Sequence, residues 1–128
     1  MIRIGHTVLT AVTALALFAG CGQGASGSSG PSAQEVVDDL NPLFPVGHQR
    51  DNTESCTSAG CEQLITTDAV SVYRMHDEST AAHFADGLGN AVEQIGPFVL
   101  SYSGSKQQLT PSETRAAYAR HVRALLGG

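Results

Sequence analysis

The 128-residue sequence lacks the short motifs by which common enzyme classes are recognised. It contains no Gly-x-Ser-x-Gly elbow of serine hydrolases, no phosphate-binding loop, no dinucleotide-binding fingerprint and no His-Glu-x-x-His metal motif. The sequence therefore gives no basis for assigning a reaction.

Basic residues are scarce. The chain has 7 Lys+Arg against 12 Asp+Glu, and without Arg3 the balance is 6 minus 12, or -6. This charge argues against binding to nucleic acid and against electrostatic attraction to anionic lipid. Eleven of the acids lie in residues 35–93, whereas the last 35 residues carry four of the cations. Such asymmetry is typical of a solvated surface, and a docking face for a partner is the alternative interpretation.

No apolar run is long enough to span a bilayer. The longest covers residues 7–18, about 12 residues, whereas a transmembrane helix needs roughly 20. Arg3 precedes the run, and the small residues Ala19 and Gly20 follow it before Cys21. This order predicts a cleaved secretory signal. An uncleaved membrane anchor is the alternative, and Cys21 is incidental both in that case and in an ordinary signal peptide without lipid attachment.

The segment Phe18-Ala19-Gly20-Cys21 resembles the bacterial lipoprotein box, although the family most often has leucine at the first position. The resemblance implies that the thiol of Cys21 receives a diacylglyceryl group and that Cys21 becomes the first mature residue. Two or three acyl chains would give durable attachment. We expect a signal peptide at 1–20, a lipidated cysteine and flexible Gly/Ser tether at 21–32, and one domain at 33–128. The expected location is the extracytoplasmic face of the cell membrane.

Only three cysteines are present, so assigning Cys21 to lipid leaves Cys56 and Cys61 as a pair. Disulfides persist in the oxidising compartment that an exported domain reaches. A redox-active pair favours Cys-x-x-Cys spacing, and a zinc site needs two further ligands. We predict a structural Cys56–Cys61 disulfide.

Hydrophobic patterning predicts an α+β fold, with a small three- to four-stranded mixed or antiparallel sheet, helices on one face and a βαβ-like core. Ser32 is expected to cap a first helix, Asp77 a second and Thr110 a third. Residues 63–75 form either one strand or a hairpin, and residues 95–102 form another strand. The second helix would bury Ala81, Phe84, Ala85 and Leu88.

Several segments together resemble small secreted lipoproteins of actinobacteria, of mycobacterial type. They are Arg50-Asp51-Asn52-Thr53, the Cys56 and Cys61 pair, residues 63–68, Val70-Ser71-Val72-Tyr73 and Val99-Leu100-Ser101-Tyr102. The likeness covers most of residues 34–123. These lipoproteins have no assigned activity, so the resemblance implies no catalytic residues.

Two classes of function remain open. The leading prediction is a noncatalytic, lipid-anchored binding module that docks an envelope protein, a wall polymer or a small ligand, without a cofactor or metal. The histidines His48, His76, His83 and His121 lack the spacing of metal ligands. The alternative is a small hydrolase or other enzyme of the envelope that uses some of Asp51, His48 and Ser101. A polar pocket that unites these three residues would favour it.

Overall fold

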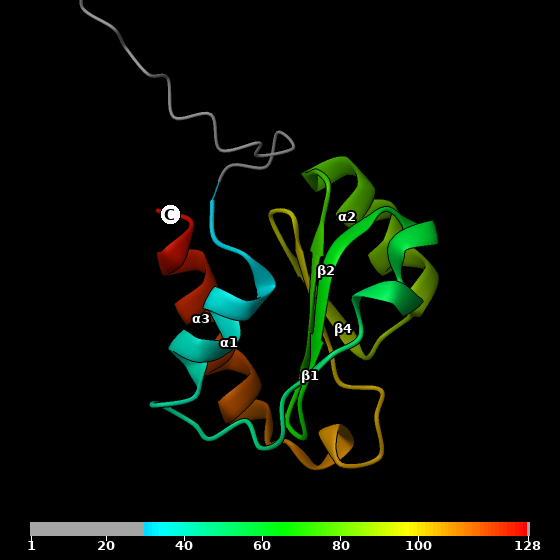
Figure 1. Ribbon diagram of the computed structural model, residues 1–128. Coiled ribbons are helices and arrows are strands. Elements are labelled where there is room, and N and C mark those ends of the chain that lie inside the picture. The colour runs from blue at the N-terminus through cyan, green and yellow to red at the C-terminus, as the bar shows by residue number, and fades with distance from the viewer. Residues whose placement is uncertain (1–29, 128) are drawn as a thin grey trace, which may run out of the picture.

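The computed structural model describes residues 30–127, in which a five-stranded antiparallel sheet lies between helices (Figure 1). The helices are α1 (Ala33–Leu40), α2 (Glu78–Leu88) and α3 (Ser112–Leu125). The strands are β1 (Arg50–Asp51), β2 (Cys61–Thr66), β3 (Ser71–Met75), β4 (Val92–Ile95) and β5 (Phe98–Ser101). Three short 3₁₀ turns are η1 (Thr53–Ser55), η2 (Thr57–Ala59) and η3 (Gln107–Leu109). The α+β class is confirmed, but the prediction of three to four strands is wrong, because the described residues form five.

The strand order in the sheet is β1-β2-β3-β5-β4, and every neighbouring pair is antiparallel. Because β3 and β4 both run antiparallel to β5, which lies between them, they run parallel to each other. The chain passes from β3 to β4 through α2. The βαβ-like core expected between residues 63–75 and 95–102 is not formed in that way, because β3 and β5 pair antiparallel. Instead β3, α2 and β4 make a split βαβ arrangement, with β5 inserted between the two parallel strands.

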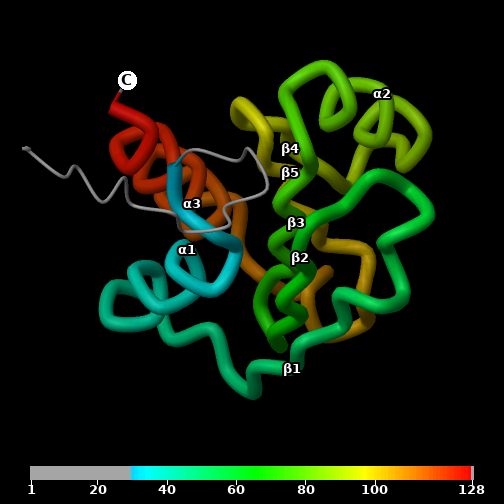
Figure 2. The backbone as a smooth tube through the Cα atoms, turned by 45° about the horizontal axis from the view of Figure 1, so that its top comes forward, coloured from blue at the N-terminus to red at the C-terminus, as the bar shows by residue number. Residues whose placement is uncertain are grey.

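Helices lie on both faces of the sheet, which corrects the prediction of helices on one face (Figure 2). Helices α1 and α3 pack on one face over a core that includes Ile65, Val72 and Leu100. Helix α2 packs on the other face over Leu64, Met75 and Val99. The reason is visible in β2, β3 and β5, which have buried side chains in both alternating positions. Strands buried on both faces read as near-continuous apolar runs rather than as clean alternation.

Helix α1 begins where the sequence predicts. The Ser32 hydroxyl accepts from the Glu35 backbone N–H, and the Glu35 carboxylate accepts from the Ser32 N–H, which completes a capping box. Val36, Val37 and Leu40 are fully buried against the sheet and α3. The helix contributes one wall of the larger core.

Residues 63–75 form a hairpin rather than a single strand, which settles the choice that the pattern left open. Thr67 organises its turn. The backbone N–H and the hydroxyl of Thr67 both donate to the Val70 carbonyl, at 3.0 and 2.7 Å, and the hydroxyl accepts from Ala69 N at 3.2 Å and Val70 N at 3.0 Å. The Thr67 side chain is buried, so these bonds satisfy polar groups that water cannot reach.

Strand β4 is absent from the sequence prediction, which extends a single strand from Ile95. The structure instead has a two-residue connection, Gly96-Pro97, between Ile95 and its partner Phe98. Gly96 adopts a left-handed conformation with φ of 56°. A tight hairpin of this kind needs a positive φ, which glycine adopts without steric cost.

Two details of the helices differ from prediction. Leu88, expected in the buried stripe of α2, is 41% exposed because it lies in the last turn, beyond the edge of the sheet-facing cluster. The Thr110 hydroxyl does not cap α3 but donates to the Ala69 carbonyl at 2.8 Å. The tertiary bond to the β2–β3 turn has replaced the local capping bond. Asp77, in contrast, caps α2 by accepting from Thr80 N, as predicted.

The Cys56–Cys61 disulfide is present and is buried in the cluster beneath α2. It joins the segment between η1 and η2 to the first residue of β2. The ring therefore fixes the two 3₁₀ turns against the sheet.

Candidate functional site

A row of polar side chains crosses the face of the sheet that α2 covers in part. Residues paired directly across antiparallel strands point to the same face. The register pairs Arg50 with Thr66, Thr66 with Ser71, and Ser71 with Ser101. The next row on this face is apolar and consists of Leu64, Tyr73 and Val99, which contact α2. The face is thus divided into an apolar half under α2 and a polar half beyond it.

A hollow of about 420 Å³ lies over this polar half. We call it the polar hollow, and its lining residues come from β1, β2, the β2–β3 turn, β3 and the loop after β5. They are Arg50, Thr66, Thr67, Asp68, Ser71 and residues 103–107. The other hollows lined by polar residues each involve fewer parts of the described fold. One is formed by the consecutive residues 51–55 alone, and two lie beside Gly30 and Pro31.

The Gln107 side chain holds the floor of the polar hollow. It is buried, and its amide nitrogen donates to the Thr67 carbonyl at 2.9 Å and to Ser71 Oγ at 2.8 Å. Its amide oxygen accepts from Gly104 N at 3.0 Å. One side chain therefore connects the loop after β5 to both arms of the β2–β3 hairpin.

Arg115 fixes the same loop from the side of α3. Its guanidinium donates to the carbonyls of Thr110, Gln107 and Gln108 at 2.9, 3.3 and 3.1 Å. The guanidinium carbon also lies 4.4 Å from the centre of the Tyr102 ring. A planar guanidinium can make these contacts together, whereas an ammonium group cannot.

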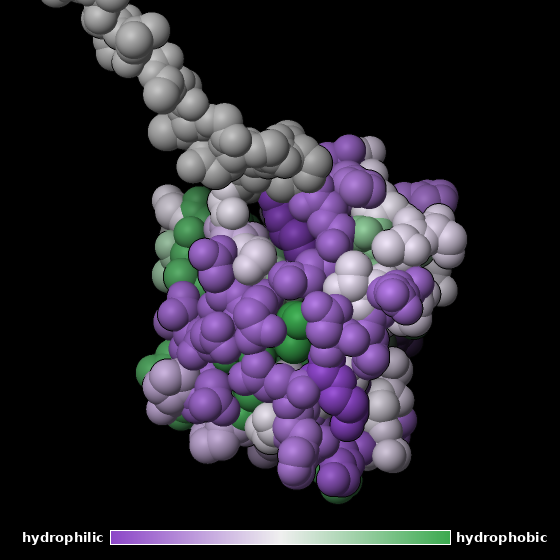
Figure 3. Space-filling model, in the orientation of Figure 1, coloured by the Kyte–Doolittle hydropathy of each residue, from purple (hydrophilic) through white to green (hydrophobic). Residues whose placement is uncertain are grey.

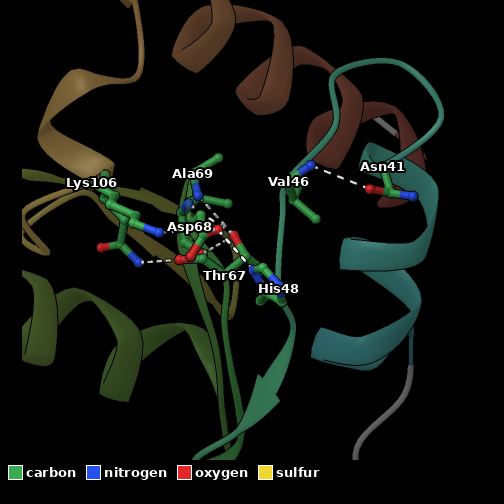
Figure 4. Close-up of polar contacts among 9 residues, drawn as sticks. Asn41, Val46, His48, Thr67, Asp68, Ala69 and Lys106 are labelled. Carbon is green, nitrogen blue, oxygen red and sulfur yellow. Dashed lines mark hydrogen bonds and ion pairs between the residues drawn. The ribbon is translucent and has the colours of Figure 1, made fainter.

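Asp68 is the only carboxylate that lines the polar hollow. It is hydrogen-bonded to His48 Nδ1 at 3.2 Å, and Lys106 Nζ lies 3.8 Å from the same oxygen (Figure 4). The hydrogen bond with His48 holds the pKa of Asp68 below its usual range, against partial desolvation, and the charge of Lys106 acts in the same direction. Asp68 therefore stays ionised, and the ammonium group of Lys106 offsets part of its charge.

Gly47 is required beside Asp68. Its φ is 85°, and a Cβ at this position would lie 2.6 Å from an Asp68 carboxylate oxygen. Any larger residue would be strained and would push the carboxylate away from His48. The close approach fixes the position of Asp68 at the rim.

Arg50 differs from Lys106, the other cation of the polar hollow. No hydrogen bond or ion pair joins its side chain to another residue in the part of the chain that the structure describes. Ser71 Oγ accepts from Gln107, and no acceptor for the Ser71 proton lies within residues 30–127. The hollow thus holds a guanidinium and a hydroxyl with unused donor capacity.

The three residues of the predicted hydrolase do not converge. Ser101 is buried, and its hydroxyl is bonded to Ser103 Oγ at 3.0 Å. Asp51 is exposed and accepts from the Thr53 hydroxyl and from Thr53 N, and these two hydrogen bonds, the hydroxyl one first, lower the pKa of Asp51 as ordinary turn-forming contacts. His48 is 87% exposed and bonded to Asp68. Ser101 lies three strands away from β1, or roughly 14 Å at normal strand spacing.

The predicted histidine positions are also separate. His76 is bonded to Glu62 at 3.1 Å, whereas His83 is exposed on α2. Within residues 30–127, no group of three or more His, Cys, Asp or Glu side chains is arranged to hold a metal ion. Cys21 and the tether up to residue 29 lie outside the described residues.

Sequence reasoning did not identify Arg50, Lys106 and Gln107 as site residues. Arg50 occurs in an exposed polar segment, and the other two occur in a short polar loop, where such residues are common. Only the strand register brings them together. The Gly47-to-Asp68 contact likewise has no local signal.

A hollow of a different character lies at the same end of the molecule. It has a volume of about 270 Å³ and is lined by Phe44, Pro45, Ala69, Thr110, Pro111, Thr114 and Tyr118. The Tyr118 hydroxyl donates to the Phe44 carbonyl at 3.0 Å and so closes its floor. Leu109, which is 80% exposed, is the most exposed large apolar side chain in the described part of the chain.

Comparison with known proteins gives no relative: no family model, no curated protein and no solved structure matches this chain. None of the helices in residues 30–127 has the length and apolar character needed to cross a membrane. The resemblance to actinobacterial lipoproteins stays a prediction. The geometry of the site is therefore the basis for a functional assignment.

Proposed function

We propose that this protein is a noncatalytic binding module, anchored by lipid on Cys21 to the extracytoplasmic face of the cell membrane, whose ligand site is the polar hollow. The observation that carries the proposal is the hollow itself. It gathers lining residues from five segments of the described fold but contains no paired nucleophile and base.

The position of the N-terminal end of the described chain, relative to the polar hollow, supports anchoring through Cys21. The described chain starts at the top of Figure 1, whereas the β2–β3 turn and η3, which border the polar hollow, lie at the bottom. A tether attached at Gly30 would hold the domain by the end opposite its site. With eight residues between Cys21 and Gly30, a flexible tether has a typical reach of roughly 16 Å. The site would then face away from the bilayer.

The Cys56–Cys61 disulfide is a second support, because such bonds persist in extracytoplasmic compartments. Hydrophilic residues dominate the face in Figure 3, which supports contact of this face with water rather than with lipid. The hydrolase alternative has no comparable support, because Asp51, His48 and Ser101 lie apart.

Mass spectrometry of membranes combined with site-specific crosslinking tests the proposal. A photoreactive residue at Ser105, on the rim of the polar hollow, is compared with one at His83 on α2. His83 is also exposed but does not line the hollow. We expect diacylglyceryl on the N-terminal Cys21 peptide, and crosslinked products from position 105 but not from position 83.

Cys21→Ser is the control for anchoring. We expect this variant to leave the membrane fraction and to lose the position-105 products. If the intact chain yields no lipidated peptide, or no more products than Cys21→Ser, the proposed function is wrong.

A further inference from the structure

The charge of the polar hollow is opposite to that of the whole protein. The chain carries a net charge of -5, yet the hollow is lined by two cations, Arg50 and Lys106, and by one carboxylate, Asp68. Counting these three groups gives 2 minus 1, or +1. A positive site on an acidic protein attracts a negatively charged ligand more strongly than the rest of the protein surface does.

The same residues disfavour a cation. A metal or an ammonium ligand would have only Asp68 as a charged partner, and that carboxylate already lies within 3.8 Å of Lys106 and 3.2 Å of His48. The positive charges of Arg50 and Lys106 would repel a cationic ligand. The electrostatics of the hollow therefore select the sign of the ligand.

The free donors fit an oxygen-rich anion. A guanidinium presents a planar set of N–H donors that matches a carboxylate or phosphate group. Arg50 has no competing partner within the described residues. The Ser71 hydroxyl also keeps a proton to donate. An anionic oxygen group would complete the hydrogen bonding of the hollow.

The size and lining of the hollow indicate that the ligand carries hydroxyl groups in addition to the anionic group. The volume of about 420 Å³ lies in the usual range of small-ligand sites, roughly 300–1,000 Å³. The remaining lining is hydroxyl and backbone from Thr66, Ser103 and Ser105, without an aromatic side chain or a large apolar one. Such a lining suits a molecule that is polar over its whole surface.

We infer that the polar hollow binds an acidic sugar, with its carboxylate or phosphate at Arg50 and Lys106 and its hydroxyl groups over the Thr66, Ser71 and Ser103 side chains. The inference depends on the proposed function, because it specifies the ligand of the same site. Free acidic sugars and acidic units of a wall polymer share this chemistry.

Nuclear magnetic resonance titration of the full chain in detergent tests the inference. The probes are glucuronate, glucose 6-phosphate and neutral glucose at constant ionic strength. We expect the two anionic sugars to shift the amide signals of Arg50 and residues 103–107, and glucose to bind at least about tenfold more weakly, as expected for loss of a charge-assisted contact. Binding of only one anionic sugar supports the inference and identifies the oxyanion.

Arg50→Gln should weaken binding of the anionic sugars about tenfold, and Lys106→Gln should weaken it by a smaller factor because Lys106 also contacts Asp68. Arg120→Gln is the matched control, since it removes an exposed arginine of α3 that does not line the hollow. It should leave the affinity unchanged. The unperturbed signals of α1, which contains none of the substituted residues, report that each variant is folded.

Three results would overturn the inference: no shift with either anionic sugar, equal binding of glucose, or equal weakening by Arg50→Gln and Arg120→Gln. A wall fragment that competes with glucuronate would identify the polymer as the source. Position-105 crosslinks in membranes, obtained without any sugar binding, would leave the binding-module proposal intact and reject only this ligand class.

Discussion

Thr67 shows how one side chain can determine a turn. Its hydroxyl has three hydrogen-bond partners in the β2–β3 turn, and the residue is only 1% exposed. Its carbonyl in turn accepts from Gln107. The turn and the floor of the polar hollow therefore depend on the same residue.

Thr67→Val tests this dependence, because it keeps the side-chain shape and removes only the hydroxyl. We expect the free energy of unfolding to fall by about 2 kcal/mol, since buried turn N–H groups lose their acceptor. Chemical denaturation measures the change. Thr114→Val is the control, as Thr114 is a partly exposed residue of α3, and should change stability by less than about 0.5 kcal/mol. Equal effects of the two variants would contradict the role of the hydroxyl.

At the scale of elements, α2 depends on its N-cap residue, Asp77. The Asp77 carboxylate accepts from Thr80 N at 2.7 Å, and this backbone hydrogen bond lowers the pKa of Asp77 from its usual 3.8. A carboxylate at a helix N-terminus also interacts favourably with the helix dipole. The ionised form therefore favours the folded state.

This contribution predicts a pH dependence. Because the folded pKa of Asp77 is below the unfolded value, its stabilisation is complete above that unfolded value and is lost as pH falls through the folded pKa. Asp77→Asn keeps a capping side chain that does not titrate. We expect the stability of the wild-type chain, relative to Asp77→Asn, to decrease between about pH 5 and pH 2. A difference that is constant over this range would show that Asp77 does not titrate with folding.

The elements also show what the sequence could and could not predict. The caps of α1 and α2 are local, so Ser32 and Asp77 were predictable from neighbouring residues. Strand β4 was missed because Val92–Ile95 contains Glu93 and Gln94, although Gly96-Pro97 was an available turn signal. Thr110 looked like a cap, but a long-range bond to Ala69 displaced that role. Local signals fail where a tertiary partner competes for the same group.

The candidate site was less predictable than the fold. The cysteine count predicted the disulfide pair, because assigning one of three cysteines to lipid leaves a single pair, and this reasoning needs no geometry. It did not predict the polar hollow, because the pairing of Arg50 with Thr66 and Ser71 with Ser101 is a property of register. A shift of one residue in any of these pairs would turn the row to the other face.

At the scale of the whole molecule, the disulfide acts chiefly on the unfolded chain. Its sequence separation is 5, and the loop-entropy model gives about 2 kcal/mol for so small a ring. The double variant Cys56→Ala with Cys61→Ala should lose about this much stability in chemical denaturation. A reductant should lower the stability of the wild-type chain similarly and leave the double variant unchanged. If neither treatment alters stability, the ring does not constrain the unfolded chain.

The split arrangement of the sheet has a consequence for the order in which the molecule can assemble. Strand β5 is among the last to be synthesised, yet it lies between β3 and β4. Until residue 101 is available, β3 has an open edge, and β4 has no hydrogen-bonding partner. Unpaired strand edges are sites of aggregation, and chains fold from the N-terminus as they emerge. A growing or translocating chain would therefore need protection, by a chaperone or by rapid transit, over the interval between the completion of β3 and the arrival of β5.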